Sequence, residues 1–249
     1  LAREFSQKGY RVFAADIDAK VLTLFKDLEN VFSKKLDVTN ESQVGSWARE
    51  ISVESNGLDI MICLAGIYDS YPVTEADPQL FKQILAVNLF GTSVLVQAFL
   101  NPLLKNKGRI IVVTSESYKI QAMFQPYMIT KAALEAYCRV ARQELALKDV
   151  KLAIIRPGAI RTPLLNWMDT DEDGNKYPVF RKEYVEARKK SVKMVGRIAS
   201  PEKVARIILR ASTVKYPKRV YRINNNPVLT LISLIPSGII DRLIVRIFK

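Results

Sequence analysis

Short runs of apolar and β-branched residues alternate along the chain with longer stretches in which apolar residues recur every three to four positions. The longer stretches predict amphipathic helices, and the short runs predict strands over 11–15, 58–64, 109–114, 151–156 and 219–223. Asp77-Pro78 and Ser200-Pro201 each combine a capping side chain with a proline at the first helical position. Two of the helices should therefore begin at these sites, the first running to about residue 105.

This alternation predicts an α/β fold, a doubly wound parallel sheet covered by helices on both faces in three αβα layers. Ligands of such sheets bind beyond the carboxyl ends of the strands. The 249 residues, 49% of them hydrophobic, suffice for one domain over 1–249. We expect a mobile substrate lid at about 163–199, where an acidic turn at 169–174 precedes a basic run.

Charge is distributed unevenly along the chain. Residues 1–175 hold 20 basic and 21 acidic side chains, whereas residues 176–249 hold 18 basic and 4 acidic ones. A field this one-sided attracts phosphate, anionic lipid or an acidic partner, although a solvated helix face gives the same count. Few aromatic residues interleave with the basic ones and no reader motif is present, so we expect no nucleic-acid partner.

The chain ends on an apolar segment, 227–249, which Pro236 and Gly238 interrupt and which carries charge near its end. It is too short and too charged to predict a membrane span. A helix over 238–248 would place several apolar side chains on one side: Ile240, Leu243, Ile244 and Ile247. Such a helix either packs on its own domain or on a second subunit, or makes peripheral contact with a membrane.

The chain has no histidine and two cysteines. The absence of histidine excludes Ser-His-Asp triads, Cys-His proteases and zinc sites with His ligands, and we expect no metal. Two cysteines cannot form a disulfide framework, which favours the reducing cytoplasm. Cys63 falls in a predicted buried strand and Cys138 on a helix, so both are expected to be small buried hydrophobic residues.

Four polar side chains are candidates for proton chemistry. Tyr127 and Lys131 lie one helical turn apart and therefore share a face. A Tyr-Lys pair at this spacing arises readily by chance, so its weight depends on two further residues. Ser115 lies at the carboxyl end of the strand predicted over 109–114, and Asn88 lies within a predicted helix, where asparagine is locally unfavourable.

With these residues the chain resembles the classical short-chain dehydrogenase/reductase family, in order over nearly its whole length. The family's YxxxK motif is matched by Tyr127 and Lys131, its serine by Ser115 and its helix asparagine by Asn88. Its PGxxxT motif is matched by 157–162, and the segments LDVT and AGI carry its Asp-Val pair and the end of its NNAG motif. The resemblance implies a Rossmann-type fold and an enzyme that transfers hydride between NAD(H) and a secondary alcohol or ketone.

The resemblance also implies a role for each of the four side chains. A Lys131 ammonium close to the Tyr127 phenol would lower the pKa of that phenol toward the working range. Lys131 would in addition hold the ribose of the nicotinamide. Ser115 would bind the substrate oxygen, and Asn88 would connect Lys131 to solvent through a water molecule.

Asp16 ends the second strand of the family's pattern, where its carboxylate would meet the adenosine ribose and favour NAD(H) over NADP(H). Asp18 is a near alternative, and Arg11 and Lys20 could weaken the repulsion of a 2′-phosphate. The resemblance implies further cofactor contacts. Asp37 and Val38 would lie at the adenine, and Ala65 and Gly66 at a strand end. The contacts at the carboxamide side and the two helix residues complete the set: Pro157, Gly158, Ile160, Thr162, Tyr127 and Lys131.

The chain departs from the family pattern in two places. Cys63 and Leu64 replace the two asparagines of NNAG, and we expect a buried apolar pair that leaves the sheet intact. The family's first strand and its TGxxxGxG turn are absent, because residues 1–10 resemble the later turns of the helix that follows that turn. We therefore expect roughly 20 further residues upstream, about half a βαβ unit.

An apolar lid and C-terminus favour a steroid, retinoid or lipid-like substrate, contacted by Ser115, Leu164 and Trp167. Two alternatives remain open. One is a reductase of 3-oxoacyl chains on an acidic carrier protein, which the basic last third would attract. The other is a non-catalytic binding protein that uses its basic, apolar end at a membrane or partner surface. The resemblance also implies a homodimer or homotetramer, built partly through the helices that carry Asn88 and Tyr127.

Overall fold

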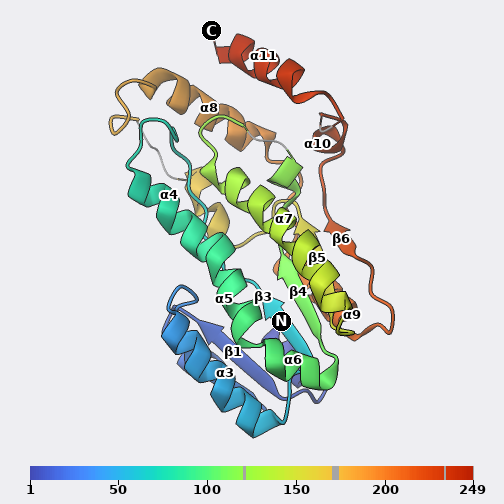
Figure 1. Ribbon diagram of the computed structural model, residues 1–249. Helices are drawn as coiled ribbons and strands as arrows, with labels where there is room; N and C mark the ends of the chain where they lie inside the picture. Colours follow the sequence, from blue (N-terminus) through green and yellow to red (C-terminus); the bar gives the residue numbers. More distant parts are fainter. Residues whose placement is uncertain (120–121, 170–173, 233, 249) are drawn as a thin grey trace.

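A computed structural model of the chain describes the following residues: 1–119, 122–169, 174–232 and 234–248 (Figure 1). Parallel strands form its centre, in two groups. The first group pairs β1 (Val12–Asp16) with β2 (Val31–Lys35). The second is a sheet of four strands in the order β3 (Ile60–Cys63), β4 (Arg109–Val113), β5 (Lys151–Pro157) and β6 (Val220–Ile223). In the described part of the chain these two groups form separate sheets.

All five predicted strands are present, with ends within two residues of the predicted ones. The sequence did not predict β2, because Lys34 and Lys35 interrupt its short apolar run. Lys34 is accommodated by an ion pair with Glu50 of α3 (Glu41–Ser55). The strand pairs only with β1, so it does not need the continuous apolar run of a central strand.

Helices cover both faces of the sheet. The helices that cover one face are α3, α5 (Gly91–Ala98), α6 (Leu100–Asn106) and α7 (Pro126–Ala146). Helix α4 (Pro78–Leu85) packs against α7. The other face is covered by α1 (Ala2–Ser6) and α9 (Pro201–Thr213). A short helix, α2 (Val21–Leu24), connects β1 to β2. This arrangement confirms the predicted doubly wound α/β fold in three layers.

The strand residues alternate between the two cores. Along β4, Ile110 and Val112 pack with the helices that include α7, whereas Ile111 packs with α9. Cys63 and Cys138 are both buried in the first core, as predicted. Burial raises the pKa of each thiol to about 12, so both remain protonated, inert apolar groups at neutral pH.

The two predicted capping sites are confirmed, since Asp77 accepts a hydrogen bond from the Gln79 amide and Ser200 from the Lys203 amide. The helix expected to run to about residue 105 is instead interrupted, first by a π-helical turn over Ala86–Phe90. The stretch Pro78–Ala98 has the length and composition of a membrane-crossing helix. It packs against α7 and carries the buried Asn88.

The predicted lid contains a 3₁₀ turn (Pro163–Asp169) and α8 (Arg181–Met194), while the acidic residues 170–173 lie outside the described part of the chain. Two contacts hold the start of α8 to the loop after β3. Glu75 accepts hydrogen bonds from the Val179 and Phe180 amides, and the buried Tyr184 donates to the Ser70 carbonyl. Whether the lid moves stays a prediction, but its helix is anchored at one end.

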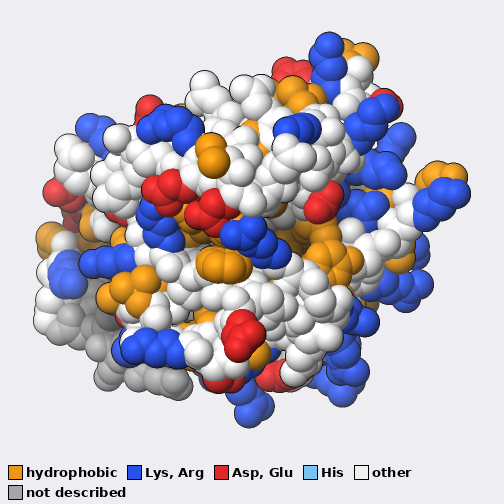
Figure 2. Space-filling view, turned by 90° about the horizontal axis from the view of Figure 1, so that it is seen from below, with side chains coloured by type: hydrophobic (Ala, Val, Ile, Leu, Met, Phe, Trp, Pro, Cys, Tyr) orange, Lys and Arg blue, Asp and Glu red, His pale blue; other side chains and the backbone are white. Residues whose placement is uncertain are grey.

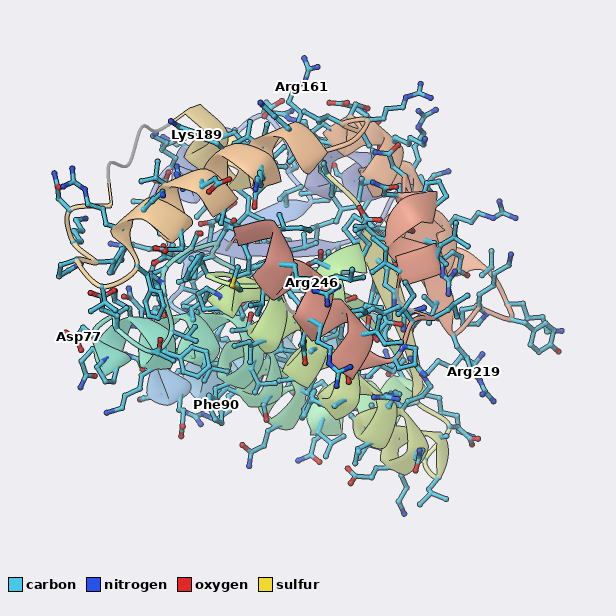
Figure 3. All side chains as sticks on the ribbon, turned by 90° about the horizontal axis from the view of Figure 1, so that it is seen from above. Asp77, Phe90, Arg161, Lys189, Arg219 and Arg246 are labelled. Atoms are coloured by element: carbon cyan, nitrogen blue, oxygen red, sulfur yellow. The ribbon has the colours of Figure 1, made fainter. Side chains whose placement is uncertain are left out.

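The C-terminal segment forms α10 (Pro227–Ile232) and α11 (Ser237–Phe248), as its apolar pattern predicts. Figure 3 shows α11, which carries Arg246, lying beside α8, and the Lys190 ammonium donates to the Ile247 carbonyl. Ile240 and Ile244 are partly buried, but Leu243 and Ile247 are 47% and 57% exposed. Only part of the predicted apolar side therefore packs on the domain.

Basic side chains gather on one side of the molecule. In the view from below, Lys and Arg concentrate on the side where Figure 1 draws α9 and β6 (Figure 2). Lys203, Arg206 and Arg210 lie on the exposed face of α9. Part of the positive excess of the last third is therefore a solvated helix face.

Candidate active site

Tyr127 and Lys131 occupy the first turns of α7, which begins at Pro126 because proline tolerates the first helical position. The Lys131 ammonium lies 5.5 Å from the centre of the Tyr127 ring. Both side chains are buried, at 8% and 4% exposure. The Lys131 amine donates to the Val113 carbonyl at the end of β4 (3.4 Å), so it connects the helix to the strand. Tyr127 and Lys131 therefore share one face of α7, as predicted.

Ser115 lies two residues beyond the end of β4, at the carboxyl edge of the sheet. Its hydroxyl is 2.8 Å from that of Ser117. It also lies close enough to the Tyr127 phenol to favour the ionised form of that phenol. The parallel strand therefore delivers a hydroxyl to the phenol at the start of α7. The strand-end position that the sequence predicted for Ser115 is confirmed.

Asn88 lies in the π-helical turn and is fully buried. Its side-chain oxygen accepts from the Ile67 amide (2.8 Å), and its amide nitrogen donates to the Ile67 carbonyl (2.9 Å) and the Thr130 hydroxyl (3.0 Å). These bonds explain why asparagine is retained within a helix, because its amide ties the loop after β3 to α7. A π turn at such a position is frequent at functional sites.

The charges in the site differ from the sequence-based expectation. Burial raises the pKa of the Tyr127 phenol, and the nearby Ser115 hydroxyl only partly opposes that rise. Burial also lowers the pKa of the Lys131 amine to about 8. The expected lowering of the phenol's pKa by the ammonium is therefore not found in the protein alone. Both groups lose hydration, which disfavours their charged forms more than the lysine favours the phenolate.

Several of the residues expected to contact the cofactor lie at the carboxyl ends of the strands. Gly66 follows β3, and a Cβ atom there would lie 3.4 Å from the Asn88 oxygen and 3.5 Å from the Lys131 nitrogen. The bare glycine thus leaves space beside two of the polar groups. Asp16 ends β1 with its carboxylate exposed and accepting from the Asp18 amide, and Asp37 follows β2. The predicted contacts of the nicotinamide and adenosine halves therefore lie along one edge of the strands.

The other predicted cofactor residues lie at the same edge. Val38 packs against Gly91, where a Cβ atom would come within 2.7 Å of the valine side chain. Ala65 precedes Gly66, and Pro157 ends β5. Gly158 follows directly, and a Cβ atom there would lie 2.4 Å from the Asn224 carbonyl, so the loop can approach β6 only with glycine.

The remaining residues of PGxxxT form a loop held against the segment before α9. Ile160 forms a β-bridge with Ala199, and the Thr162 hydroxyl donates weakly to the Ile160 carbonyl (3.5 Å). Leu164 is 36% exposed in the 3₁₀ turn that follows. The side chain of Trp167, the other predicted substrate contact, lies outside the described part of the structure.

Two sequence-based expectations near the site are wrong. Cys63 is buried but Leu64 is 54% exposed, because β3 ends at Cys63 and Leu64 already lies at the open edge. Arg11 does not approach Asp16, because it starts β1 at the opposite end and pairs with Glu54 at 2.8 Å. Arg11 therefore cannot weaken the repulsion that Asp16 would exert.

The sequence analysis missed two sets of polar residues near the site. Tyr68 packs its ring 5.2 Å from that of Tyr127 and donates to Gln125. No sequence signal distinguishes it. Glu135 is buried one helical turn beyond Lys131 and binds Arg156. Its spacing places it on the face shared by Tyr127 and Lys131, but the sequence does not show that this position is buried.

A family model described as "Enoyl-(Acyl carrier protein) reductase" matches residues 1–210. Rat (Rattus norvegicus) estradiol 17-beta-dehydrogenase 2 is 28% identical over 242 residues, which cover 89% of this chain and 63% of that protein. Mouse (Mus musculus) retinol dehydrogenase 5 is 29% identical over 244 residues, which cover 89% of this chain and 75% of that protein. The chain thus spans less than two thirds of the length of the rat relative.

The fold also matches that of solved structures. The crystal structure of a short-chain dehydrogenase from Streptomyces avermitilis superposes with a TM-score of 0.78 at 20% identity. The match covers 97% of this chain and 87% of that one. At this identity the likeness supports the fold, and the chemistry must be argued from the side chains at the carboxyl edge.

Proposed function

Because this chain belongs to the short-chain dehydrogenase/reductase family, we propose that it transfers hydride between a nicotinamide cofactor and the carbon of a secondary alcohol or ketone. One observation carries the proposal. Tyr127 and Lys131 on α7, Ser115 after β4 and Asn88 in the π turn lie together at the carboxyl edge of the sheet. A binding protein that kept only the fold would not need these four groups together.

Each side chain has a defined task in this proposal. Tyr127 donates its phenolic proton to the substrate oxygen in reduction and accepts it back in oxidation. Ser115 hydrogen-bonds to the same oxygen and orients it. Lys131 holds the ribose next to the nicotinamide, and Asn88 positions the loop that carries Gly66. When bound, the nicotinamide supplies or accepts the hydride.

The cofactor is NAD(H) in preference to NADP(H). Support comes from Asp16, whose exposed carboxylate at the end of β1 can accept hydrogen bonds from ribose hydroxyls and repels a 2′-phosphate. Neither of the basic residues considered from the sequence removes this repulsion. Arg11 is engaged by Glu54, and Lys20 lies 3.9 Å from Asp18, which it partly neutralises instead.

The substrate is an apolar alcohol of steroid, retinoid or lipid type. Two named relatives are dehydrogenases of estradiol and retinol, both largely apolar molecules. Leu164 contributes an exposed apolar surface after PGxxxT. These relatives favour an alcohol dehydrogenase over the two alternatives, a reductase of carrier-borne acyl chains and a non-catalytic binding protein.

The C-terminal helices would place the protein at a membrane surface. Apolar side chains on α10, on α11 and between them are exposed: Leu231, Leu234, Ile239, Leu243, Val245 and Ile247. Arg242 and Arg246 lie on the same helix α11. An exposed apolar side with basic neighbours suits the boundary of an anionic lipid layer.

Self-association would use the helices that carry Asn88 and Tyr127. Phe90 in the π turn and Val140 on α7 are 59% and 57% exposed, although both are apolar. A second copy covering these side chains would remove them from water. Sedimentation of the protein tests this homodimer or homotetramer against a monomer.

The function is tested by NADH absorbance with a panel of secondary alcohols that runs from small and polar to steroid-sized and apolar. We expect turnover with NAD⁺ that favours the apolar members. A protein that binds NADH but oxidises none of the panel and reduces none of the matching ketones would contradict the proposed function.

A further inference from the structure

A buried carboxylate, Glu135, lies behind the active site on α7. It follows Lys131 by four residues and Tyr127 by eight, so it continues the same helix face. Its side chain is only 1% exposed. Burying a carboxylate is costly unless it is paired and hydrogen-bonded, and Glu135 is both. None of the tasks assigned above to the four site residues uses it.

The carboxylate accepts three hydrogen bonds from two other elements. Its Oε1 atom accepts from the Thr114 hydroxyl (2.7 Å) and from Nε of Arg156 (2.7 Å), and its Oε2 atom accepts from Nη2 of Arg156 (2.8 Å). The arginine therefore binds in a two-pronged, planar geometry that fixes orientation as well as distance. We call Glu135, Arg156 and Thr114 the carboxylate clasp.

The clasp joins the three chain segments that carry the site. Thr114 directly precedes Ser115, Arg156 directly precedes Pro157 and Gly158, and Glu135 lies on the helix that carries the phenol and the amine. The Thr114 amide also donates to the Ile155 carbonyl, which aligns the ends of β4 and β5. A shift of the clasp would therefore move the serine, the PGxxxT loop and α7 relative to one another.

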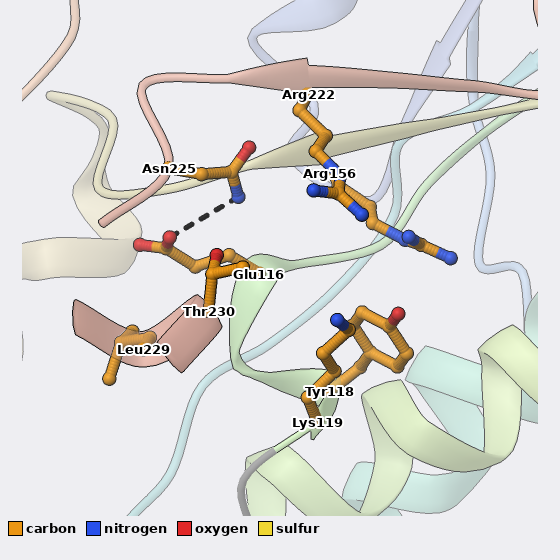
Figure 4. A pocket seen from close by; sticks show the side chains of 8 residues that line it. All are labelled: Glu116, Tyr118, Lys119, Arg156, Arg222, Asn225, Leu229 and Thr230. Carbon is orange, nitrogen blue, oxygen red and sulfur yellow. Dashed lines mark hydrogen bonds between the residues drawn. The ribbon is translucent and has the colours of Figure 1, made fainter. Parts of the chain in front are cut away.

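Arg156 also has contacts with residues outside the carboxylate clasp. Its guanidinium lies 4.2 Å from the centre of the Tyr118 ring, in the 3₁₀ turn after Ser115 (Glu116–Lys119). Figure 4 shows Arg156, Tyr118 and Arg222 among the residues that line a pocket. Arg222 is the register partner of Arg156 on β6. Like charges directly opposite on neighbouring strands repel, so the carboxylate of Glu135 also offsets this repulsion.

We propose that Glu135, through its bonds to Arg156 and Thr114, is a positioning residue that holds Ser115 and the PGxxxT loop against the Tyr127 helix during hydride transfer. This inference rests on the proposed function, because it assigns Glu135 to the same reaction. The alternative is that the clasp only stabilises the fold. The two are separable, since a buried ion pair can often be replaced by apolar side chains of similar volume without loss of stability.

The test is the double variant Glu135→Met/Arg156→Met, which removes both charges together and leaves no unpaired buried ion. Its matched control is Glu54→Met/Arg11→Met, which removes an exposed ion pair between α3 and β1. Urea unfolding and the stoichiometry of NADH binding establish that each variant is folded and binds cofactor. We expect kcat to fall about 10- to 100-fold in the Glu135 variant, with an unchanged binding stoichiometry, and to stay at the wild-type value in the control.

A second readout does not depend on turnover. Hydrogen exchange should accelerate at the amides of 114–118 and 158–162 in the Glu135 variant but not in the control. A folded double variant with wild-type kcat and wild-type exchange in both segments would overturn the positioning role. If the wild type itself oxidised no alcohol, the proposed function would fail, and exchange alone would decide whether the clasp holds these segments.

Discussion

Single side chains in this site are polar groups that the fold has removed from water. Asn88 and Lys131 are 0% and 4% exposed, and each is compensated by specific bonds to the chain segments around it. The residues that would carry the reaction thus also connect the loop after β3, the end of β4 and helix α7. The burial of Lys131 has a consequence for stability that can be measured.

Lys131 lowers the stability of the folded protein at neutral pH. Its amine has a pKa of about 8 in the folded protein against an ordinary value of 10.5. Between these pH values the unfolded chain binds a proton that the folded protein does not, so stability rises with pH through this window. Below pH 8 the amine is buried as the charged ammonium, so the full desolvation cost lowers the free energy of unfolding.

Lys131→Met should therefore be more stable than the wild type at pH 7, by about 2 kcal/mol after the lost bond to Val113 is counted. The advantage should shrink between pH 8 and pH 10. Urea unfolding of both proteins at pH 7 and pH 9.5 measures this. If the difference in free energy of unfolding between the two proteins did not change with pH, the buried charge of Lys131 would not be its cause.

The proposed preference for NAD(H) over NADP(H) depends on the carboxylate of Asp16. Removing its charge by Asp16→Asn should raise the ratio of kcat/KM for NADP⁺ to that for NAD⁺ at least about tenfold, because the repulsion of the 2′-phosphate is lost. Asp18→Asn is the matched control, two residues away on the same loop. Equal ratios in the wild type and Asp16→Asn, or a change only in the control, would move the ribose contact away from Asp16.

Among helices and strands, α7 does most to assemble the site, and its neighbours hold it in register. Its first turn brings the phenol to Ser115, and its third turn binds β4 and β5 through Glu135. Helix α8 approaches from the other side and is fixed to the loop after β3 through Glu75 and Tyr184. The lid helix is thus docked on the loop that leads from Gly66 to α4.

Glu75→Ala tests this docking. The two amides it leaves without an acceptor, Val179 and Phe180, begin α8, so the local free energy of opening should fall by about 1 to 2 kcal/mol. Hydrogen exchange at the first turn of α8 reports the change. The control is Glu183→Ala, which removes an acidic side chain of the first turn of α8 itself. It should leave the exchange rates as in the wild type. Equal exchange in all three proteins would mean that Glu75 does not hold the lid.

The sequence predicted the elements that follow simple periodicity and missed those that depend on neighbours. The five apolar strands and the caps at Asp77 and Ser200 are local signals and were found. Strand β2 was missed, because the partner of Lys34 is distant in sequence. The π turn around Asn88 was also missed, since a helix-long apolar pattern does not reveal a local change of pitch.

The site residues also divide into those that local signals reveal and those that depend on the tertiary fold. Ser115, Tyr127 and Lys131 could be placed because strand ends and helical spacing fix their positions. The direction of the pKa shift of Tyr127 could not, because it depends on how deeply the tertiary fold buries the phenol. Glu135 was missed for the same reason, as a charged residue on a helix is expected to be solvated until its partners are known.

Over the whole molecule, charge and exposed apolar surface are concentrated in the last third of the sequence. Residues 176–249 carry 18 basic and 4 acidic side chains. Some of them cover α9, but others accompany the exposed apolar side chains of α11. This arrangement favours contact with an anionic lipid surface by a protein whose catalytic edge lies elsewhere.

Replacing two exposed apolar residues of α11, by Leu243→Ser and Ile247→Ser together, should reduce binding to vesicles that contain anionic lipid at least about tenfold. Binding is measured by co-sedimentation at two salt concentrations, because the basic part of the attraction weakens with salt. The control is Val53→Ser, which removes an 85% exposed apolar side chain from α3. Equal binding by all three proteins would show that α11 is not the contact.

The account depends most on the phenol of Tyr127 as the proton donor and acceptor. The most direct measurement is single-turnover oxidation of an apolar secondary alcohol by Tyr127→Phe, followed through NADH absorbance, with Tyr137→Phe on the same helix as control. We predict a rate at least about 100-fold below the wild type for Tyr127→Phe and a wild-type rate for Tyr137→Phe, with NADH binding retained in both. Wild-type oxidation by Tyr127→Phe would contradict the account.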